Sequence, residues 1–339
     1  MNSNNLDDIN EMDETMDLPR VRHTPPSRKK STHVLKKMTR SALTGWDSIA
    51  ANIKNFTYQP SRHESEWLMS SLGEFYDQRW FEDILMMVKG GKEASVYLCR
   101  SSVQVGVPLI AAKVYRPRRF RNLKNDHIYR EGRSQVETDG KIILDDGKLH
   151  AMAQKTRFGM ELLHESWLGH EYKTMELLAK AGADIPRPYA SGANAILMQY
   201  IGDEVAAAPT LNTISLSSTE ARVLFERVVH NIDVCLKAGR IHADLSAYNI
   251  LYWQGEISLI DFPQAIHPDE NRNAYRIFQR DVLRVCEYFA GQGVHSDPLG
   301  LARQLWLAQG RRIAPEIDPL YLDPEKREDR RAWEKQGRS

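Results

Sequence analysis

Cysteine is scarce in this chain of 339 residues, and no CxxC pair occurs. Cys99, Cys235 and Cys286 lie far apart, so neither a disulfide framework nor a zinc knuckle is indicated. Long apolar runs are lacking too, since the longest fall far short of the roughly 20 residues that a bilayer crossing needs. The N-terminus also has no apolar signal-peptide core. We therefore expect a cytoplasmic protein with reduced thiols and no membrane contact.

An excess of either charge is also absent. Lys plus Arg (46) nearly balance Asp plus Glu (45), so the charge of the whole chain favours no particular partner. The distribution is uneven, because residues 7–17 carry only acids and residues 20–40 carry only bases. Such blocks seldom fold alone, so we expect a disordered tail over 1–64 and a charged C-terminal tail over 316–339. The basic block either folds back on the acidic one or contacts RNA or another polyanion.

What the sequence does contain is a compact set of polar residues in the segment IHADLSAYNILYWQGEISLIDFPQA, residues 241–265. Phosphoryl transfer needs a carboxylate that accepts the proton of the attacking hydroxyl, and oxygen ligands for Mg²⁺. We assign the first role to Asp244 and the metal to Asn249 and Asp261. The spacing resembles the protein-kinase catalytic loop, with Asp-Phe-Pro in place of Asp-Phe-Gly. The alternative is a surface hairpin whose polar residues only cap turns.

A glycine-containing hairpin is predicted in the segment KGGKEASVYLC, residues 89–99. Glycines at 90 and 91 permit a tight turn, and the backbone amides at Gly91 can approach phosphate oxygens. Lys92 and Ser95 would add side-chain contacts, and Val96 would line the nucleotide site at the start of the returning strand. The GxGxxG of ordinary kinases is missing, so the hairpin by itself favours a structural turn.

Lys113 lies inside the apolar strand LIAAKVY, residues 109–115. Such a lysine is either an edge residue whose stem snorkels or a charge held for anionic phosphates. We favour the phosphate role, which requires a carboxylate partner. Glu171, in a helix expected over 167–180, is the predicted partner. Glu176 is the competing candidate, although its position favours a solvated helix residue.

The segments on either side of that helix have different expected roles. Residues 116–165 are dense in Arg, Lys, Asp and Gly, and we expect a flexible insert with a small hairpin over 141–148. Residues 195–200 are predicted to form a strand that leads to the adenine site. There the backbone of Gln199 to Ile201 would face the adenine edge, with Met198 at the back of the pocket. A buried edge strand explains the same residues.

Two helices are expected to support the catalytic loop. One runs over 220–238 with Ser218 or Thr219 as its N-cap, and the other over 275–289. Arg280 and Asp281 of the second helix are predicted to brace the loop by hydrogen bonds, with an ordinary surface ion pair as the alternative.

His242, in the same loop, is predicted to donate to nearby backbone as a structural residue, because Asp244 already serves as the base.

Seven short segments resemble the motifs of one protein family more specifically than the loop spacing alone does. They are GKEASVYLC (91–99), AAKVYRP (111–117), WLGHE (167–171), MQYIGDE (198–204), AAPTL (207–211), IHADLSAYNILY (241–252) and LIDFPQA (259–265). Through them the chain resembles the RIO family of atypical protein kinases over roughly residues 67 to 290. The form of the hinge segment favours the subfamily without an N-terminal winged helix.

The resemblance implies an α+β, two-lobed protein-kinase-like fold. Its small β-rich N-lobe would cover residues 65–202, and its mostly helical C-lobe, without an activation segment, would cover 203–315. It also implies dependence on ATP and Mg²⁺, with Lys113 as a nucleotide ligand. Asp244 would be the proton acceptor, and Asp261 a metal ligand that also carries the phospho-aspartate attributed to this family.

These observations together predict a non-specific serine/threonine protein kinase that transfers the γ-phosphoryl group of ATP to a serine of a protein substrate, or to itself. Two alternatives stay open. One is a small-molecule kinase of the aminoglycoside phosphotransferase kind, which shares the spacing of the loop. The other is an ATPase switch acting on a ribonucleoprotein partner, since members of the resembled family act in maturation of the small ribosomal subunit.

Overall fold

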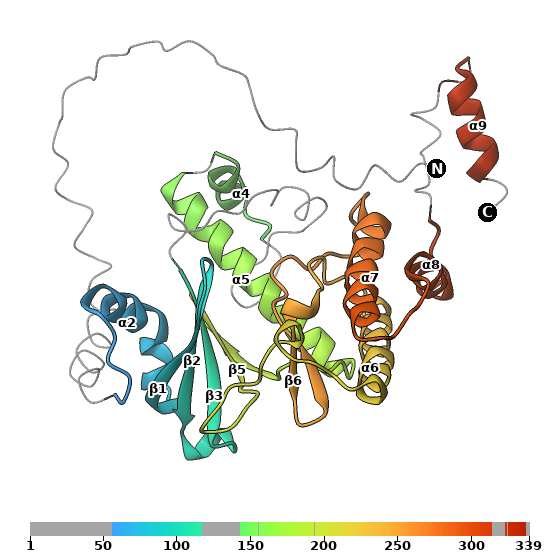
Figure 1. Cartoon of the computed structure of the whole chain (residues 1–339). Helices are drawn as coiled ribbons and strands as arrows, with labels where there is room; N and C mark the ends of the chain where they lie inside the picture. The colour runs from blue at the N-terminus through green and yellow to red at the C-terminus, as the bar shows by residue number, and fades with distance from the viewer. Residues whose placement is uncertain are drawn as a thin grey trace, which may run out of the picture. The chain divides into compact units, whose positions relative to one another are not determined.

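The computed structural model describes residues 56–116, 143–154, 156–192, 194–313, 323 and 325–336 (Figure 1). Most of the expected N-terminal tail, residues 1–55, lies outside the described residues. So do residues 117–142 of the expected insert and most of 314–324. Among the described helices, none has the length and apolar content that a membrane span requires.

The chain ahead of the first strand is part of the folded structure. Phe56 is buried, and the backbone N–H of Tyr58 donates to the carbonyl of Ile84 at 2.8 Å. Helix α2 (Arg62–Asp77) follows, capped by Ser61. Residues 56–64, which the prediction assigned to the tail, are therefore part of the folded structure, because apolar and aromatic side chains anchor this segment to the sheet.

Five antiparallel strands form a single sheet in the order β1-β2-β3-β5-β4. The strands are β1 (Phe81–Gly90), β2 (Ala94–Ser101), β3 (Leu109–Tyr115), β4 (Pro188–Ser191) and β5 (Ala195–Gln199). Lys113 lies on β3 between Val96 of β2 and Ile196 of β5. Since β3 and β5 are both interior strands, the alternatives of an edge lysine and of a buried edge strand at 195–200 are wrong.

Helix α2 covers one face of this sheet. Its Leu68, Leu72 and Phe75 are buried in one apolar cluster with residues of β2, β3 and β5. The indole Nε1 of Trp67 also donates to the carbonyl of Tyr115 at 3.0 Å, at the end of β3. The opposite face is left for the functional cavity, because side chains alternate between the two faces of a strand.

Two helices replace part of the expected flexible insert. They are α4 (Asp146–Ala153) and α5 (Arg157–Lys180). The hairpin predicted over 141–148 is therefore wrong, because Asp145 accepts from the backbone N–H of Lys148 and starts α4 instead. The two helices meet at Gly159, where an added Cβ would lie 1.8 Å from the carbonyl oxygen of Ala151. Only glycine permits this approach.

The C-terminal part is mostly helical. Its elements are η4 (Leu211–Thr213), α6 (Ser218–Lys237), η5 (Ala247–Asn249), β6 (Ile250–Trp253), β7 (Glu256–Leu259), α7 (Ala274–Gly291), α8 (Pro298–Ala308) and α9 (Arg327–Gln336). The N-cap of α6 is Ser217, one residue before the earlier of the two expected caps, and it accepts from the backbone N–H of Glu220. Helices α6, α7 and α8 enclose the larger apolar core, which also takes in the buried face of α5.

Candidate active site

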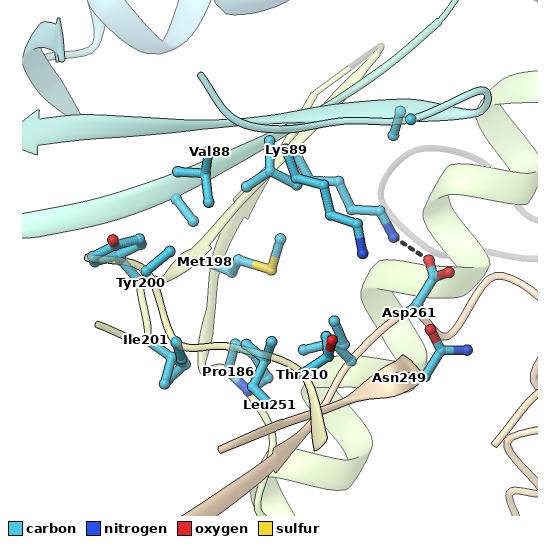
Figure 2. A pocket seen from close by; sticks show the side chains of 18 of the residues that line it. Val88, Lys89, Pro186, Met198, Tyr200, Ile201, Thr210, Asn249, Leu251 and Asp261 are labelled. Carbon is cyan, nitrogen blue, oxygen red and sulfur yellow. Dashed lines mark hydrogen bonds and ion pairs between the residues drawn. The ribbon is translucent and has the colours of Figure 1, made fainter. Parts of the chain in front are cut away.

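A cavity of about 540 Å³ lies between the sheet and the C-terminal part (Figure 2). This volume falls within the range of about 300–1,000 Å³ that is usual for small-molecule sites. Ten of the residues that the sequence singled out line it: Gly91, Lys92, Val96, Lys113, Glu171, Met198, Gln199, Ile201, Asn249 and Asp261. Its walls are otherwise largely apolar, and include Val88, Ala111, Pro186 and Leu251.

The structure does not place Ser95 where the sequence predicted it, in contact with a phosphate. Its side chain is buried, and it does not line the cavity. Its neighbours Ala94 and Val96 do. Because alternate residues of a strand point to opposite faces, Ser95 faces away from the site and is not placed to contact a ligand there.

Lys113 joins the two parts of the chain at the base of the cavity. Its Nζ lies 2.6 Å from Glu171 Oε1 and 2.6 Å from Asp261 Oδ1 (dashed line to Asp261 in Figure 2). Burial would lower the pKa of Lys113, but Asp261 and Glu171 outweigh that effect and hold this pKa well above its ordinary value. Lys113 is therefore a firmly charged ammonium, although its side chain is only 11% exposed.

Glu171, on α5, is the buried partner of this lysine. Its side chain is only 1% exposed, and its second oxygen accepts a hydrogen bond from the Tyr115 hydroxyl. The competing candidate, Glu176, is 42% exposed and pairs with Lys173 on the same helix at 3.1 Å. The alternative pairing through Glu176 is therefore wrong.

Asp261 follows β7 with a backbone φ of +74°. This left-handed conformation is uncommon for residues with a side chain, and such residues often belong to functional sites. Desolvation would raise the pKa of the Asp261 carboxyl, but the Lys113 ammonium more than offsets this, so the pKa lies below its ordinary value. The backbone N–H of Ile260 donates to the carbonyl of Asn249 at 2.9 Å, which holds Asn249 and Asp261 near one another.

Asp244 lies beside the cavity, outside its lining. Its carboxylate is 52% exposed, and Asn249 Nδ2 donates to its Oδ2 at 3.2 Å and to its carbonyl oxygen at 2.8 Å. Its other oxygen, Oδ1, lies 3.1 Å from Nη1 of Arg284 on α7. Asp244 is thus oriented from two sides while remaining open to an incoming group.

Helix α7 braces the loop that carries Asp244. The buried carboxylate of Asp281 accepts from the backbone N–H of Ala243 at 2.7 Å, and Arg280 Nη2 donates to the carbonyl of the same residue. Burial raises the pKa of Asp281 to about 7, although both of these neighbours oppose the shift. Ala243 itself has a φ of +66°, so its backbone depends on these contacts. The predicted brace through Arg280 and Asp281 is confirmed.

His242 has the structural role that the sequence predicted. Its Nε2 lies 3.0 Å from the carbonyl of Ile260, and its Nδ1 accepts from the backbone N–H of Asp244 at 3.4 Å. This pairing requires the neutral tautomer with the proton on Nε2. Burial lowers the pKa of His242, which favours the same uncharged form.

Replacing Asp281 with alanine should lower the free energy of unfolding by about 1–3 kcal/mol, because it leaves the buried N–H of Ala243 without an acceptor. Urea denaturation measures this. The matched control is Asp269→Ala, since Asp269 is an exposed aspartate whose ion pair with Arg311 should contribute at most about 1 kcal/mol. Equal losses in the two variants would contradict the brace.

Three contacts of the site were not predicted from the sequence. Arg284 pairs with Asp244, the Tyr115 hydroxyl holds Glu171, and Lys89 of β1 reaches the cavity two residues before Gly91 (Figure 2). A signal existed for Arg284, which follows Arg280 by four residues and so shares a helix face with it. Tyr115 and Lys89 could be placed only once the strand register was known.

The antiparallel sheet, the helical C-terminal part and the cavity between them define a two-lobed, protein-kinase-like fold. The model of the RIO domain matches residues 111–299, which is more than half of the chain. The chain therefore belongs to the RIO domain family. The expected absence of a winged helix concerns residues before Phe56, outside the described part, and stays a prediction.

Several curated proteins are similar to this chain. The RIO-type serine/threonine-protein kinase Rio1 of Haloferax volcanii is 28% identical over 215 residues, covering 62% of this chain and 64% of that protein. A probable serine/threonine-protein kinase RIO1 homolog of Encephalitozoon cuniculi is 31% identical over 161 residues, or 46% and 38% of the two chains. The serine/threonine-protein kinase RIO3 of Bos taurus is 30% identical over 202 residues, or 58% and 37%. The match thus spans less than two thirds of each of these relatives.

Proposed function

We infer that this protein is an ATP- and Mg²⁺-dependent protein kinase of RIO type, which transfers the γ-phosphoryl group to a serine of a protein substrate or of itself. The observation that supports this is one cavity in which Lys113, Glu171, Asn249 and Asp261 meet, with Asp244 hydrogen-bonded at its side. The names of the relatives agree with it. The described cysteines are free and buried, which fits a protein of the reducing cytoplasm.

The nucleotide would lie between the apolar walls and the β1–β2 hairpin. Met198 and the segment Gln199 to Ile201 line the end of the cavity that suits an adenine ring. At the hairpin, Gly91 permits a close turn, since an added Cβ would lie 2.8 Å from the carbonyl oxygen of Ala94. Lys113 and Lys92 supply positive charge for the phosphates.

The donor atoms of Asn249 and Asp261 fit a magnesium ion. Both residues line the cavity and lie one above the other (Figure 2). The amide nitrogen of Asn249 is committed to Asp244, which leaves its oxygen for a ligand role. Mg²⁺ usually takes one or two protein oxygens together with substrate phosphates, so these two residues would be enough ligands from the protein. When bound, the ion would neutralise charge on the phosphates.

Asp244 would orient the serine hydroxyl and accept its proton. Its carboxylate is exposed enough to meet a substrate, and contacts with Asn249 and Arg284 fix its orientation. A base that is already oriented adds to the rate because fewer motions must be frozen in the transition state. The described connection between Asp261 and α7 is short and forms no peptide platform, so the surface beside Asp244 suits a flexible protein segment.

Incubation with ATP labelled at the γ-phosphate tests this proposal. Acid-stable label on protein serine is the expected result, whereas acid-labile label would mark an acyl phosphate on Asp261. Release of free phosphate alone, rising with added ribosomal particles, would favour the ATPase switch. Label on an aminoglycoside or sugar would favour the small-molecule kinase and contradict the proposal.

A further inference from the structure

Three arginines form a stripe along helix α7, here called the arginine stripe: Arg276, Arg280 and Arg284. Residues four apart in a helix share a face, so the three side chains follow one another on the same side of α7. Arg284 contacts the carboxylate of Asp244, and Arg280 contacts the carbonyl of Ala243. The arginine stripe therefore runs directly beside the loop that carries the proposed proton acceptor.

The arginine stripe keeps positive charge open to solvent. Arg276 is exposed and forms no ion pair within the described part of the chain. The side chain of Arg284 is 40% exposed although it pairs with Asp244. Two acids offset part of this charge, because Asp244 pairs with Arg284 at 3.1 Å and Asp281 lies 3.3 Å from Arg280, so Arg276 carries the charge that stays unpaired among the described residues. Asp281 is buried and faces the loop, whereas exposed Glu287 lies one turn beyond Arg284.

The turn ahead of α7 adds two more exposed acids, Asp269 and Glu270. Asp269 is already paired with Arg311 of the C-terminal part. Only residues 262–273 separate Asp261 from α7, and this connection is too short to form the peptide platform of ordinary protein kinases. The face of α7 beside Asp244 is thus the surface that an incoming protein segment would meet.

We propose that the arginine stripe binds an acidic segment of the protein substrate, next to the serine that receives the phosphoryl group. The proposal rests on the function proposed above, because the serine hydroxyl must come within hydrogen-bond distance of Asp244. A residue next to that serine then lies beside Arg284, whose guanidinium has N–H groups to spare for a second carboxylate.

The length of the arginine stripe limits where the acids must lie. Arg276 and Arg284 are eight residues apart, which is about 12 Å along a helix. An extended peptide covers that distance in about three to four residues. Acidic residues within about four positions on one side of the serine are therefore recognised, and acids further away are not.

The test uses three serine peptides of equal length, in which the residues flanking the serine are Glu, Gln or Lys. The full-length protein should phosphorylate the Glu peptide with a higher kcat/KM than the Gln peptide, and added salt should reduce this preference. In Arg276→Glu the preference should fall about three- to tenfold, since a charge is reversed rather than removed. The same variant should phosphorylate the Lys peptide better than the original protein does.

Arg303→Glu is the matched control. Arg303 is exposed on α8, away from the arginine stripe in sequence, and its replacement changes the net charge by the same amount. It should keep the preference for the Glu peptide. Equal use of the Glu and Gln peptides by the original protein, or equal effects of the two substitutions, would overturn the proposal.

Direct binding separates this proposal from the proposed function. A fluorescent Glu-rich peptide without a hydroxyl residue should bind the original protein more tightly than Arg276→Glu, as measured by anisotropy. If the original protein binds the peptide more tightly than Arg276→Glu but no serine is ever labelled, the proposed role of the arginine stripe is supported and the proposed kinase function is wrong. If serine is labelled but the Arg276→Glu substitution does not change peptide affinity, the proposed kinase function is supported and the proposed role of the arginine stripe is wrong.

Discussion

Replacing Asp244 with asparagine should slow phosphoryl transfer by a factor of about 10² or more, with nucleotide affinity nearly unchanged. Asparagine has the same size but cannot accept the proton, and it no longer attracts Arg284. Nucleotide binding should survive because Asp244 does not line the cavity. Single-turnover rates measure the transfer step, and fluorescence titration with a nucleotide analogue measures the affinity.

Asp269→Asn is the control for this experiment. Asp269 is an exposed aspartate paired with an arginine, as Asp244 is, but it belongs to the turn ahead of α7. Its replacement should leave both transfer and affinity close to those of the original protein. A loss of less than tenfold in Asp244→Asn, or an equal loss in the control, would show that Asp244 is not the base.

Replacing Lys113 with methionine should weaken both the fold and nucleotide binding. The substitution leaves the carboxylate of Glu171, which is 1% exposed, without its ammonium partner. Removing one member of a buried ion pair costs about 3–5 kcal/mol, because the other charge stays buried. Asp261 would also lose the partner that holds it at the cavity. Urea denaturation and nucleotide titration measure the two effects.

The double variant Lys113→Met, Glu171→Gln separates these effects. Neutral glutamine can still accept the hydrogen bond of Tyr115, so the buried charge is gone and much of the lost stability should return. Nucleotide affinity should stay low, since the ammonium of Lys113 no longer faces the phosphates. If the single variant is as stable as the original protein, the buried pair of Lys113 and Glu171 does not stabilise the fold.

The sequence predicted those parts of the fold whose signals are local. The strand 109–115 has the same limits in the structure as in the prediction, because its β-branched and apolar residues are bounded by clear breakers. The catalytic loop was found for a similar reason, since Asp244, Asn249 and Asp261 follow one another at short spacing. The pairing of Lys113 with Glu171 was predicted because a lysine inside an apolar strand needs a carboxylate partner, and the structure decided between Glu171 and Glu176.

The rest depended on contacts that spacing does not reveal. Ser95 looked like a phosphate ligand, but strand register turns it away from the cavity. The two acids and the glycine at 145–147 suggested a turn, yet Asp145 caps a helix that packs against α5. The functional roles of the site residues and the lobe boundaries at 202 and 315 stay predictions.

The order of strands in the sheet has a practical consequence for making shorter versions of the protein. The recognised family segment begins at residue 111, inside β3. A fragment that begins there would lack β1 and β2. Strand β3 would then be an exposed edge strand, whose unpaired backbone groups can pair with another molecule. The fragment would also lose α2, and with it the indole that secures the end of β3. A truncated version that keeps the sheet intact must begin upstream of Phe56, well before the matched segment.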